Sequence, residues 1–588
     1  MKLGGNLREL ELEPIDGIAH CNQECAGIDV LNHLEHAIRL QNNVRLSKHF
    51  AVNLYSAGQR FRAPSVTPSP SSPSPSWKCQ DFLTVDLPDR YNVGADLIER
   101  NLPQRSAKIA IHTATADLSY SDLFNLTNGA ARSLLDLGVR REERVLIAGY
   151  DSPGWVAAFL GAIRIGALPV PVNPLLQRSE DYDHYIEDSL ARVIVVDGNT
   201  EEKLAPAAAR APIKPQLLRS DKVVPDQEIV AAPTRRDDMA FWLYSSGSTG
   251  KPKAVVHLQH DIPYTCVTYA EQVLGITDKD TTFSTTGLFH AYGFGNNLTF
   301  PYWVGASTVL HAGRHTPATV LDTIEKRKPT LFFSAPTLYN AILNFEGAKS
   351  RNLGSIRHCV AAAEALPAEV WRRWKDAFGL TILDGVGSTE MLHIYCSNRL
   401  DDVRPGSSGK PVPGYELKIL DVEGQPVAQG EAGDLYVKGD SALALYWAQH
   451  EKSKHSILGD WFYTGDRYRV DGDGFYWYEG RSDDMIKVSG LWVSPIEIES
   501  ALLEHPAVAE SAVVGMSVDG FTRIKAFVIA KKDAVTGDAL VAELQEHCKS
   551  RLQRFQYPHL IEFVPDLPKT VTGKIQRYKL REKEATPA

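Results

Sequence analysis

Cysteines are few in this sequence, and none of them lies in a pairing motif. The 588 residues contain seven cysteines, and no two are spaced as C-x-x-C. This spacing suggests neither a zinc site nor a disulfide framework. We therefore expect a reducing compartment, the cytoplasm, for this chain. The seven are Cys21, Cys25, Cys79, Cys266, Cys359, Cys396 and Cys548.

An excess of basic residues is also missing. The formal net charge of −9 argues against a nucleic-acid binder whose affinity rests on neutralising phosphates. It still allows a local basic site for an anionic cofactor. The most apolar stretch, residues 155–176, contains Arg164 and three prolines. We therefore expect a buried helix followed by a strand and loop there, rather than a membrane span.

The first 76 residues lack the pattern of a packed domain. Residues 7–40 show only a weak helical pattern. Residues 42–77 contain no acidic residue, and residues 67–76 are almost entirely serine and proline, which is typical of an extended linker. A targeting signal is the alternative for the basic segment 39–62, although four acidic residues near the N-terminus do not suit one. We favour a disordered extension for residues 1–76, or a translation start set too early.

Helical and strand patterns alternate from Trp77 onward. A helix capped at Tyr120-Ser121 has its apolar side chains on one face and Gly138 just past its end. Strands that alternate with helices indicate a parallel sheet covered on both sides. The expected elements are a strand at 145–148, a helix at 153–165, a strand at 168–172, a helix at 182–190 and a strand at 192–196.

The pattern changes twice toward the C-terminus. Short segments at 417–420, 433–438 and 474–478 are bounded by turn residues and predict antiparallel strands. A compact α+β pattern follows from Pro495. It comprises strands at 508–514, 525–530 and 560–563 and a helix at 539–554. We expect the domain boundary at 480–484.

A glycine- and hydroxyl-rich stretch follows residues 239–243, which predict a buried strand. It reads Tyr-Ser-Ser-Gly-Ser-Thr-Gly-Lys-Pro-Lys over residues 244–253. Glycines let the backbone approach an anion, while amides, hydroxyls and lysines supply donors and charge. The Walker P-loop does not fit, because Ser245 replaces its first glycine and Pro252 its metal-binding hydroxyl. A flexible linker is the alternative, but Lys251 and Lys253 would be unusual in one.

The sequence SSGSTGKPK resembles the phosphate loop of the adenylate-forming superfamily, which includes acyl- and aryl-CoA synthetases, peptide-synthetase adenylation domains and luciferases. The resemblance extends over residues 80–585. It implies an α/β fold with a large N-terminal domain (77–480) of parallel sheets covered by helices, plus a small β-barrel-like part. A hinge (481–484) at Asp483 and a small mobile α+β lid (485–588) follow. The implied nucleotide contacts of the loop are Ser245, Ser246, Gly247, Ser248, Thr249, Gly250, Lys251 and Lys253.

The second motif is Asp-Gly-Val-Gly-Ser-Thr-Glu over residues 384–390, after a strand expected at 380–383. The resemblance places Thr389 on the α-phosphate, and Glu390 on Mg²⁺ together with Thr249. Carboxylate and hydroxyl oxygens suit that hard cation. A helix N-cap with an acidic first turn is the alternative. The other implied nucleotide contacts here are Asp384, Gly385, Gly387 and Ser388.

Two further motifs contact the rest of the nucleotide in the resembling family. Ala363 and Glu364 lie where the backbone passes the adenine, although the family usually has glycine in place of Ala363. The end of a buried strand is the alternative there. Asp466 is the implied acceptor for the ribose hydroxyls, and Arg481 is the second ribose or phosphate contact. An Asp after Gly is otherwise a common turn residue.

The fifth motif, Pro-Lys-Thr-Val-Thr-Gly-Lys-Ile over residues 568–575, lies in the basic tail. By resemblance Lys574 is the catalytic lysine of adenylation, because an ammonium group offsets the repulsion between carboxylate and α-phosphate oxygens. In the family the lid rotates about the hinge. That rotation would withdraw Lys574 and present residues 487–492, with Lys487 and Gly490, to form a tunnel for the pantetheine of coenzyme A.

Two segments are expected to enclose the reacting acid. The sequences LFHAYGFGN, from residue 288, and GSTEMLHIYCSN, from residue 387, are most like the benzoate-CoA ligase branch. His290 is expected by the carboxylate or the pyrophosphate exit. Aromatic and aliphatic walls suit a flat apolar ring, and ordinary packing is the alternative for any one of them. The expected wall residues are Ala291, Tyr292, Val386, His393 and Ile394.

Together these motifs predict an ATP- and Mg²⁺-dependent ligase that joins an aromatic carboxylate to coenzyme A through an acyl-adenylate. No G-x-S-x-G motif suggests a serine hydrolase. His311 and His315 are interpreted as surface or packing histidines, because Gly313 and Pro317 disfavour a metal-binding helix. The alternatives are an adenylating enzyme for another acid or a carrier-protein thiol, and a non-catalytic AMP or acyl sensor. We expect small-molecule partners without nucleic acid or membrane span, and a homodimer is left open.

Overall fold

The structure is a computed structural model of the chain. It describes residues 85–245, 251–482, 484–488, 491–518, 521–553, 555–569 and 575–585, without the side chains of residues 491, 492, 521 and 583–585. The chain divides into two units, residues 1–79 and 80–588. All described residues belong to the second unit, so the extension expected at 1–76 lies outside them.

The first sheet of this unit has four parallel strands. They are β4 (Leu168–Pro171), β3 (Arg144–Ile147), β5 (Val193–Val196) and β6 (Gln216–Arg219), in that order, accompanied by the helices α4 (Tyr120–Asp136), α5 (Pro153–Arg164), α6 (Asp183–Ser189) and α7 (Glu201–Arg210). Strand β5 is buried throughout, as is typical of a parallel sheet covered on both faces. Helix α5 begins at Pro153 after Ser152, whose side chain caps it by accepting from the Trp155 amide. The predicted alternation is confirmed.

Helix α4 is capped by a different residue from the one predicted. The Ser119 hydroxyl accepts a hydrogen bond from the Asp122 amide, and the Asp122 carboxylate accepts one from the Ser119 amide. This reciprocal capping box fixes the start of the helix at Tyr120, so the prediction of a cap at Tyr120-Ser121 was wrong. Gly138 follows the end of the helix at φ +77°, a conformation that favours glycine.

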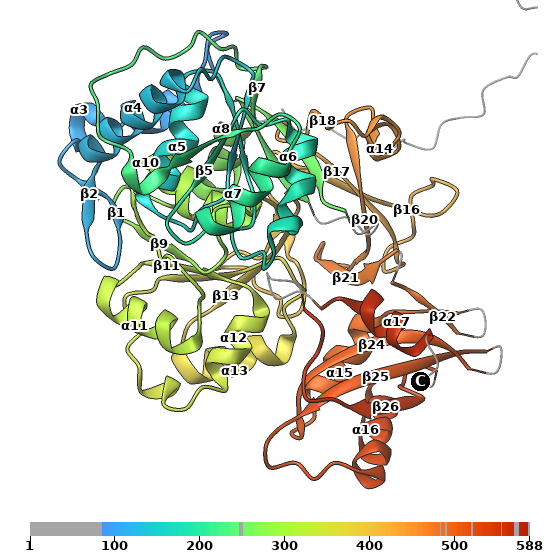
Figure 1. The fold of residues 1–588 in the computed structure, drawn as a ribbon. Coiled ribbons are helices and arrows are strands. Elements are labelled where there is room, and N and C mark those ends of the chain that lie inside the picture. The colour runs from blue at the N-terminus through green and yellow to red at the C-terminus, as the bar shows by residue number, and fades with distance from the viewer. Residues whose placement is uncertain are drawn as a thin grey trace, which may run out of the picture. The chain divides into compact units, whose positions relative to one another are not determined.

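The second sheet has nine strands and carries most of the remaining core. Its strands, in spatial order, are β15 (Lys410–Pro411), β14 (Ile394–Ser397), β13 (Ile382–Gly387), β12 (His358–Ala361), β11 (Leu331–Ser334), β9 (Thr281–Ser284), β10 (Ser307–Val309), β1 (Ile109–His112) and β2 (Asp117–Ser119). The pairs from β13 to β1 are parallel, and the outer pairs are antiparallel. The helices α11 (Pro317–Arg327), α12 (Pro336–Leu343) and α13 (Ala368–Phe378) lie beside this sheet in Figure 1. The strand predicted at 380–383 runs on to Gly387.

Two antiparallel sheets follow. The first consists of β7 (Met239–Ser245), β8 (Lys253–Leu258) and β18 (Leu445–Tyr446), with β8 in the centre. The second consists of β16 (Glu416–Leu420), β17 (Gly433–Lys438), β20 (Trp461–Val470), β19 (Ile457–Leu458) and β21 (Tyr476–Arg481). The antiparallel strands predicted after residue 400 are thus confirmed, and β7 and β8 flank the phosphate-loop motif.

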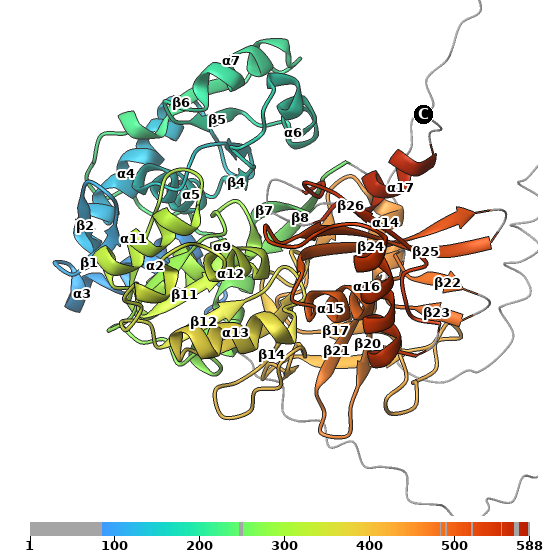
Figure 2. The same cartoon turned by 90° about the horizontal axis from the view of Figure 1, so that it is seen from below.

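The C-terminal residues have apolar clusters of their own. A cluster formed by residues 486–563 is separate from the main core. Its elements are β22 (Ile486–Val488), β23 (Leu491–Val493), α15 (Pro495–Leu503), β24 (Val508–Val518), β25 (Phe521–Ala530), α16 (Asp538–Arg551) and β26 (Leu560–Phe563) (Figure 2). Helix α17 (Arg577–Ala585) contributes Leu580 to a second, smaller cluster. Asn340 of α12 donates to the carbonyl of Ala509 on β24, so α12 contacts this C-terminal part of the chain.

The remaining helices are short. They are α2 (Val93–Glu99), α3 (Leu102–Arg105), α8 (Asp261–Thr265), α9 (Ala291–Phe294), α10 (Phe300–Val304) and α14 (His450–Ser456). Among the described helices, none has both the length and the apolar character needed to cross a membrane.

Candidate active site

The phosphate-loop motif joins two paired strands. Ser245, the last residue of β7, pairs with Lys253, the first residue of β8, and Lys251 is exposed. Burial lowers the pKa of Lys253, as does Lys452, whereas Glu390 raises it. Lys253 therefore lies close enough to the second motif for its charge to interact with that of Glu390.

Several predicted site residues lie outside the part of the chain that the structure describes. They are Ser246, Gly247, Ser248, Thr249, Gly250, Asp483, Gly490 and Lys574. Lys487 is described. It is exposed on β22 and pairs with Trp492 of β23, so the two ends of the segment expected to line a pantetheine tunnel belong to paired antiparallel strands.

The second motif begins inside the nine-stranded sheet. Residues 384–387 belong to β13, and residues 388–393 form no helix, so the helix-cap alternative is wrong. A Cβ on Gly387 would lie 2.5 Å from the His393 carbonyl oxygen, so this position has room only for glycine. Burial raises the pKa of the Asp384 carboxyl well above its usual range.

Two contacts that the sequence did not reveal hold the end of this motif. The Tyr446 hydroxyl on β18 donates to Oε1 of Glu390 over 2.9 Å. The His257 imidazole on β8 contacts the Thr389 carbonyl oxygen, with Nε2 at 2.9 Å. A histidine within an otherwise apolar strand was the only signal for the second contact, and Tyr446 carried none.

Ala363 adopts a backbone conformation that is rare for a residue with a side chain. Its φ is +76°, in the left-handed region that favours glycine. Strand β12 ends at Ala361, so the third motif is a loop that follows a buried strand. The neighbouring Glu364 accepts a hydrogen bond from the Thr337 hydroxyl over 2.6 Å. The strain at Ala363 marks a place where the backbone path is fixed by its surroundings.

Asp466 and Arg481 face each other on adjacent strands. They pair across β20 and β21, and Nη1 of Arg481 donates to Oδ1 of Asp466 over 2.9 Å. Asp466 lies within β20, so the alternative of a turn residue is wrong. The structure brings together the two side chains that the sequence assigned to the ribose.

The two expected acid-binding segments meet in the core. The rings of Tyr292 and His393 lie 5.7 Å apart between centroids, and Nε2 of His393 lies 3.3 Å from the Tyr292 carbonyl oxygen. Burial lowers the pKa of His393 to about 3, so the ring is neutral at neutral pH. The Tyr292 amide donates to Nδ1 of His290, which caps α9. Four predicted wall residues are buried and one, Val386, is half-buried: Ala291, Tyr292, His393, Ile394 and Val386.

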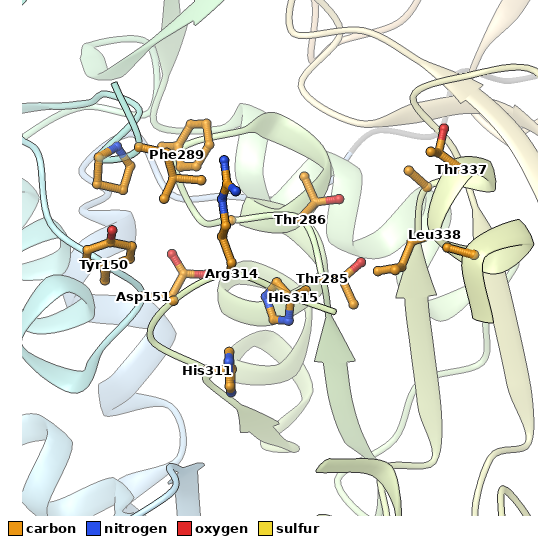
Figure 3. Close-up of a pocket in the computed structure, with 16 residues that line it drawn as sticks. Tyr150, Asp151, Thr285, Thr286, Phe289, His311, Arg314, His315, Thr337 and Leu338 are labelled. Carbon is orange, nitrogen blue, oxygen red and sulfur yellow. The ribbon is translucent and has the colours of Figure 1, made fainter. Parts of the chain in front are cut away.

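A cavity of about 290 Å³ adjoins these segments (Figure 3). It lies at the carboxyl ends of β3, β9, β10 and β11, and its lining includes Phe289, the residue before His290. His311 and His315 also line it. Burial lowers the pKa of His315 to about 3, and its ring packs against Phe283. Within the described ranges no group of three or more His, Cys, Asp or Glu side chains could hold a metal ion.

Asp151 lies in the wall of this cavity and should make stability depend on pH. It accepts hydrogen bonds from the Leu288 amide over 3.1 and 3.2 Å, and burial raises its pKa from 3.8 to about 7. A raised pKa means that the folded state binds the proton more tightly. The protonated Asp151 carboxyl therefore stabilises the folded state at low pH, and this contribution is lost as pH rises through about 7.

Asp151→Asn keeps an oxygen for the Leu288 amide but does not titrate. We expect the unfolding free energy of the unchanged protein, relative to this variant, to fall between pH 4 and 7 by up to about 1.4 kcal/mol per pH unit, and then to level off. Urea denaturation of both proteins from pH 4.5 to 8.5 measures the difference. A difference independent of pH would contradict the expectation.

Comparison with known families places these features in context. The family model for AMP-binding enzymes matches residues 98–447, and that for the C-terminal domain of AMP-binding enzymes matches residues 497–574. A benzoate–CoA ligase from Thauera aromatica is 44% identical over 84% of this chain and 97% of its own length. A 4-hydroxybenzoate–CoA/benzoate–CoA ligase from Rhodopseudomonas palustris is 40% identical over 84% of this chain and 94% of its own length.

Solved structures are similar over the same part of the chain. An anthranilate CoA ligase in complex with anthranoyl-AMP gives a TM-score of 0.82 at 41% identity, over 85% of this chain and 99% of that one. A benzoate CoA ligase from Burkholderia xenovorans gives a TM-score of 0.78 at 41% identity, over 84% and 100% of the two chains.

Proposed function

Because the chain belongs to the adenylate-forming family of AMP-binding enzymes, we propose that it is an ATP-dependent aryl-CoA ligase. The reaction joins an aromatic carboxylate to coenzyme A and releases AMP and pyrophosphate. The observation that carries this proposal is that the two expected acid-binding segments meet. Tyr292 contacts both His290 and His393, and His393 follows Thr389 and Glu390 in the same loop. Relatives at 44% and 40% identity that act on benzoate support the aromatic acid.

The chemistry proceeds in two steps. The carboxylate oxygen attacks the α-phosphorus of ATP, pyrophosphate leaves, and the aryl-adenylate that forms is attacked by the thiol of coenzyme A, which releases AMP. Phosphoryl chemistry needs positioning and charge stabilisation rather than a nucleophilic side chain. Thr389 contacts the α-phosphate, Lys574 contributes a cation for the first step, and Asp466 with Arg481 binds the ribose.

Glu390 has the chemistry of a magnesium ligand. Its carboxylate is held through Oε1 by Tyr446, and Mg²⁺ prefers such hard oxygens. Since the described residues offer no metal-binding group of three or more side chains, phosphate and water oxygens would complete the coordination, as is usual for Mg²⁺ with nucleotides. When bound, Mg²⁺ offsets charge on the phosphates. Thr249 is the second proposed protein ligand.

The acid lies between α9 and the start of β14. Ala291, Tyr292, His393 and Ile394 form a mostly apolar wall, and Val386 joins it from β13. A neutral His393 does not attract a charge, which suits an uncharged ring. His290 borders this wall, and its neighbour Phe289 lines the adjacent cavity.

We place the hinge at Asp483 and the lid at 485–588. The separate apolar cluster of residues 486–563 supports this division. Rotation of such a lid would let one site serve both steps, with Lys574 in the first and Lys487 of β22 in the second. The nucleotide contacts proposed beside these are Ser245, Lys251, Lys253, Ala363, Glu364, Asp384, Gly385, Gly387 and Ser388, with Ser246, Gly247, Ser248, Gly250 and Gly490.

A screen of substituted benzoates with ATP and coenzyme A tests the function. The purified chain should form AMP and an aryl-CoA thioester with at least one of them. Absence of both products with every benzoate would contradict the proposal. Pyrophosphate exchange with and without coenzyme A distinguishes an enzyme that loads a carrier-protein thiol, because that enzyme would adenylate the acid but form no thioester with free coenzyme A.

Removing the Tyr446 hydroxyl, which orients Glu390, should weaken Mg²⁺ binding without unfolding the protein. In Tyr446→Phe the ring remains, and only the hydrogen bond to Oε1 of Glu390 is lost. We expect the Mg²⁺ concentration for half-maximal pyrophosphate exchange to rise about three- to tenfold, with stability lower by about 1 kcal/mol. An Mg²⁺ titration of exchange, alongside thermal unfolding, measures both. An unchanged titration would show that Tyr446 does not position Glu390.

A further inference from the structure

A buried histidine of β8 contacts the segment that carries Thr389 and Glu390. The side chains of His257 and Asp261 have no exposed surface. Nε2 of His257 lies 2.9 Å from the Thr389 carbonyl oxygen, and Nδ1 lies 2.7 Å from Oδ2 of Asp261. The imidazole also stacks on Phe241, with ring centroids 5.2 Å apart. His257 is thus fixed by two polar contacts and one ring contact.

The chemistry of the acceptor fixes the proton on Nε2. A carbonyl oxygen only accepts, so Nε2 of His257 must donate to Thr389. This holds both for a neutral His257 that accepts from a protonated Asp261 and for an imidazolium–carboxylate pair. Oδ2 of Asp261 also accepts from the Leu258 amide over 3.1 Å, and Nε2 of His260 lies 3.3 Å from Oδ1. Asp261 therefore fixes the orientation of the His257 ring.

The contact fixes the direction of a peptide plane. In a trans peptide the carbonyl and the N–H point in opposite directions, and no cis peptide bond occurs among the described residues. The hydrogen bond from His257 therefore turns the amide of Glu390 away from β8. The Leu392 amide donates to the same Thr389 carbonyl over 3.1 Å. Both contacts hold the backbone that carries the side chains of Thr389 and Glu390, the proposed contacts of the α-phosphate and of Mg²⁺.

We propose that His257 and Asp261 form a positioning pair for adenylation, which holds Thr389 and Glu390 against the strand that leaves the phosphate loop. The proposal rests on the proposed function of these two loops. Strand β8 begins at Lys253, four residues before His257, and pairs with β18, which carries Tyr446. The two paired strands therefore hold the second motif at two points. His257 of β8 contacts the Thr389 carbonyl, and Tyr446 of β18 contacts the Glu390 carboxylate.

Two substitutions separate the hydrogen bond to Thr389 from the packing of the ring. In His257→Gln the side-chain amide nitrogen reaches the position of Nε2 and can still donate to Thr389. In His257→Asn it reaches only the position of Nδ1, so Thr389 loses this donor while the contact with Asp261 is kept. Both variants lose the stacking on Phe241, so each serves as the other's control for packing.

The experiment measures three quantities in the full-length protein: ATP·Mg²⁺ affinity by calorimetry, benzoate-dependent pyrophosphate exchange, and the thermal midpoint. We expect His257→Gln to stay within about fivefold of the unchanged protein. His257→Asn should exchange about 10- to 100-fold more slowly and bind ATP at least about fivefold more weakly than His257→Gln. The thermal midpoints of the two variants should agree within about 4 °C.

Equal ATP affinities and equal exchange rates in the two variants would overturn the positioning role. Losses that follow the thermal midpoints rather than the position of the donor would also overturn it. Failure of the proposed function has a different signature, in which the unchanged protein binds ATP but shows no exchange with any aromatic acid. The ratio of ATP affinities between the two variants then still decides the role of His257.

Discussion

Replacing Lys574 with alanine is expected to slow aryl-adenylate formation by about 10²- to 10³-fold, which is the usual effect of removing one charged or hydrogen-bonding group from a transition state. Thioester formation from supplied aryl-AMP and coenzyme A should stay within about threefold of the unchanged protein. The reason is that only the first step brings a carboxylate against the negative α-phosphate. Pyrophosphate exchange measures the first step, and thioester formation from synthetic aryl-AMP measures the second.

The matched control is Lys579→Ala. Lys579 lies five residues further along the same basic tail and is exposed, so its loss changes the net charge equally without removing the proposed catalytic group. This variant should keep both steps within about twofold, as is usual for surface substitutions. Equal losses in the two steps for Lys574→Ala would contradict the assignment, because a general defect of the lid would slow both.

Replacing Glu390 with glutamine should reduce adenylation by about 10²-fold and make it depend more steeply on Mg²⁺. The amide oxygen still accepts from Tyr446, so the side chain keeps its orientation. It loses the negative charge that attracts a hard divalent cation. The measurement is pyrophosphate exchange over a range of Mg²⁺ and Mn²⁺ concentrations, with thermal unfolding as a check of folding.

The control for this change is Glu451→Gln on α14. The Glu451 side chain is 80% exposed, so its neutralisation removes the same charge from the protein surface. We expect this variant to behave like the unchanged protein. A Glu390→Gln protein with an unaltered Mg²⁺ titration would remove Glu390 from the metal site. Because Glu390 raises the pKa of Lys253, the substitution should also make Lys253 easier to deprotonate.

The architecture was largely predictable because its elements have strong local patterns. Buried apolar runs predicted the ends of β5 and β7 to within two residues. The resemblance to the adenylate-forming superfamily is confirmed by the matching family models. The predicted ends of an element were wrong where a contact outside the apolar pattern determines them. Ser119 and Asp122 start α4 by mutual capping, and backbone pairing with β14 carries β13 on through Gly387.

The contacts that organise the site were not predictable from one sequence. Tyr446 and Glu390 are separated by 56 residues, and His257 and Thr389 by 132. Neither pair forms a local motif, since each depends on how β8 and β18 pack against the loop after β13. Ala363 shows the opposite case. Its departure from the family's glycine was visible in the sequence, and the structure gives its physical meaning, a left-handed backbone held at φ +76°.

The most direct test of the central claim is benzoate-dependent exchange of pyrophosphate into ATP in the absence of coenzyme A, followed by addition of coenzyme A to the same mixture. The account predicts exchange before coenzyme A is added, and AMP with benzoyl-CoA in equal amounts afterwards. Formation of ADP, or a thioester that forms without any exchange of pyrophosphate, would contradict a route through an aryl-adenylate.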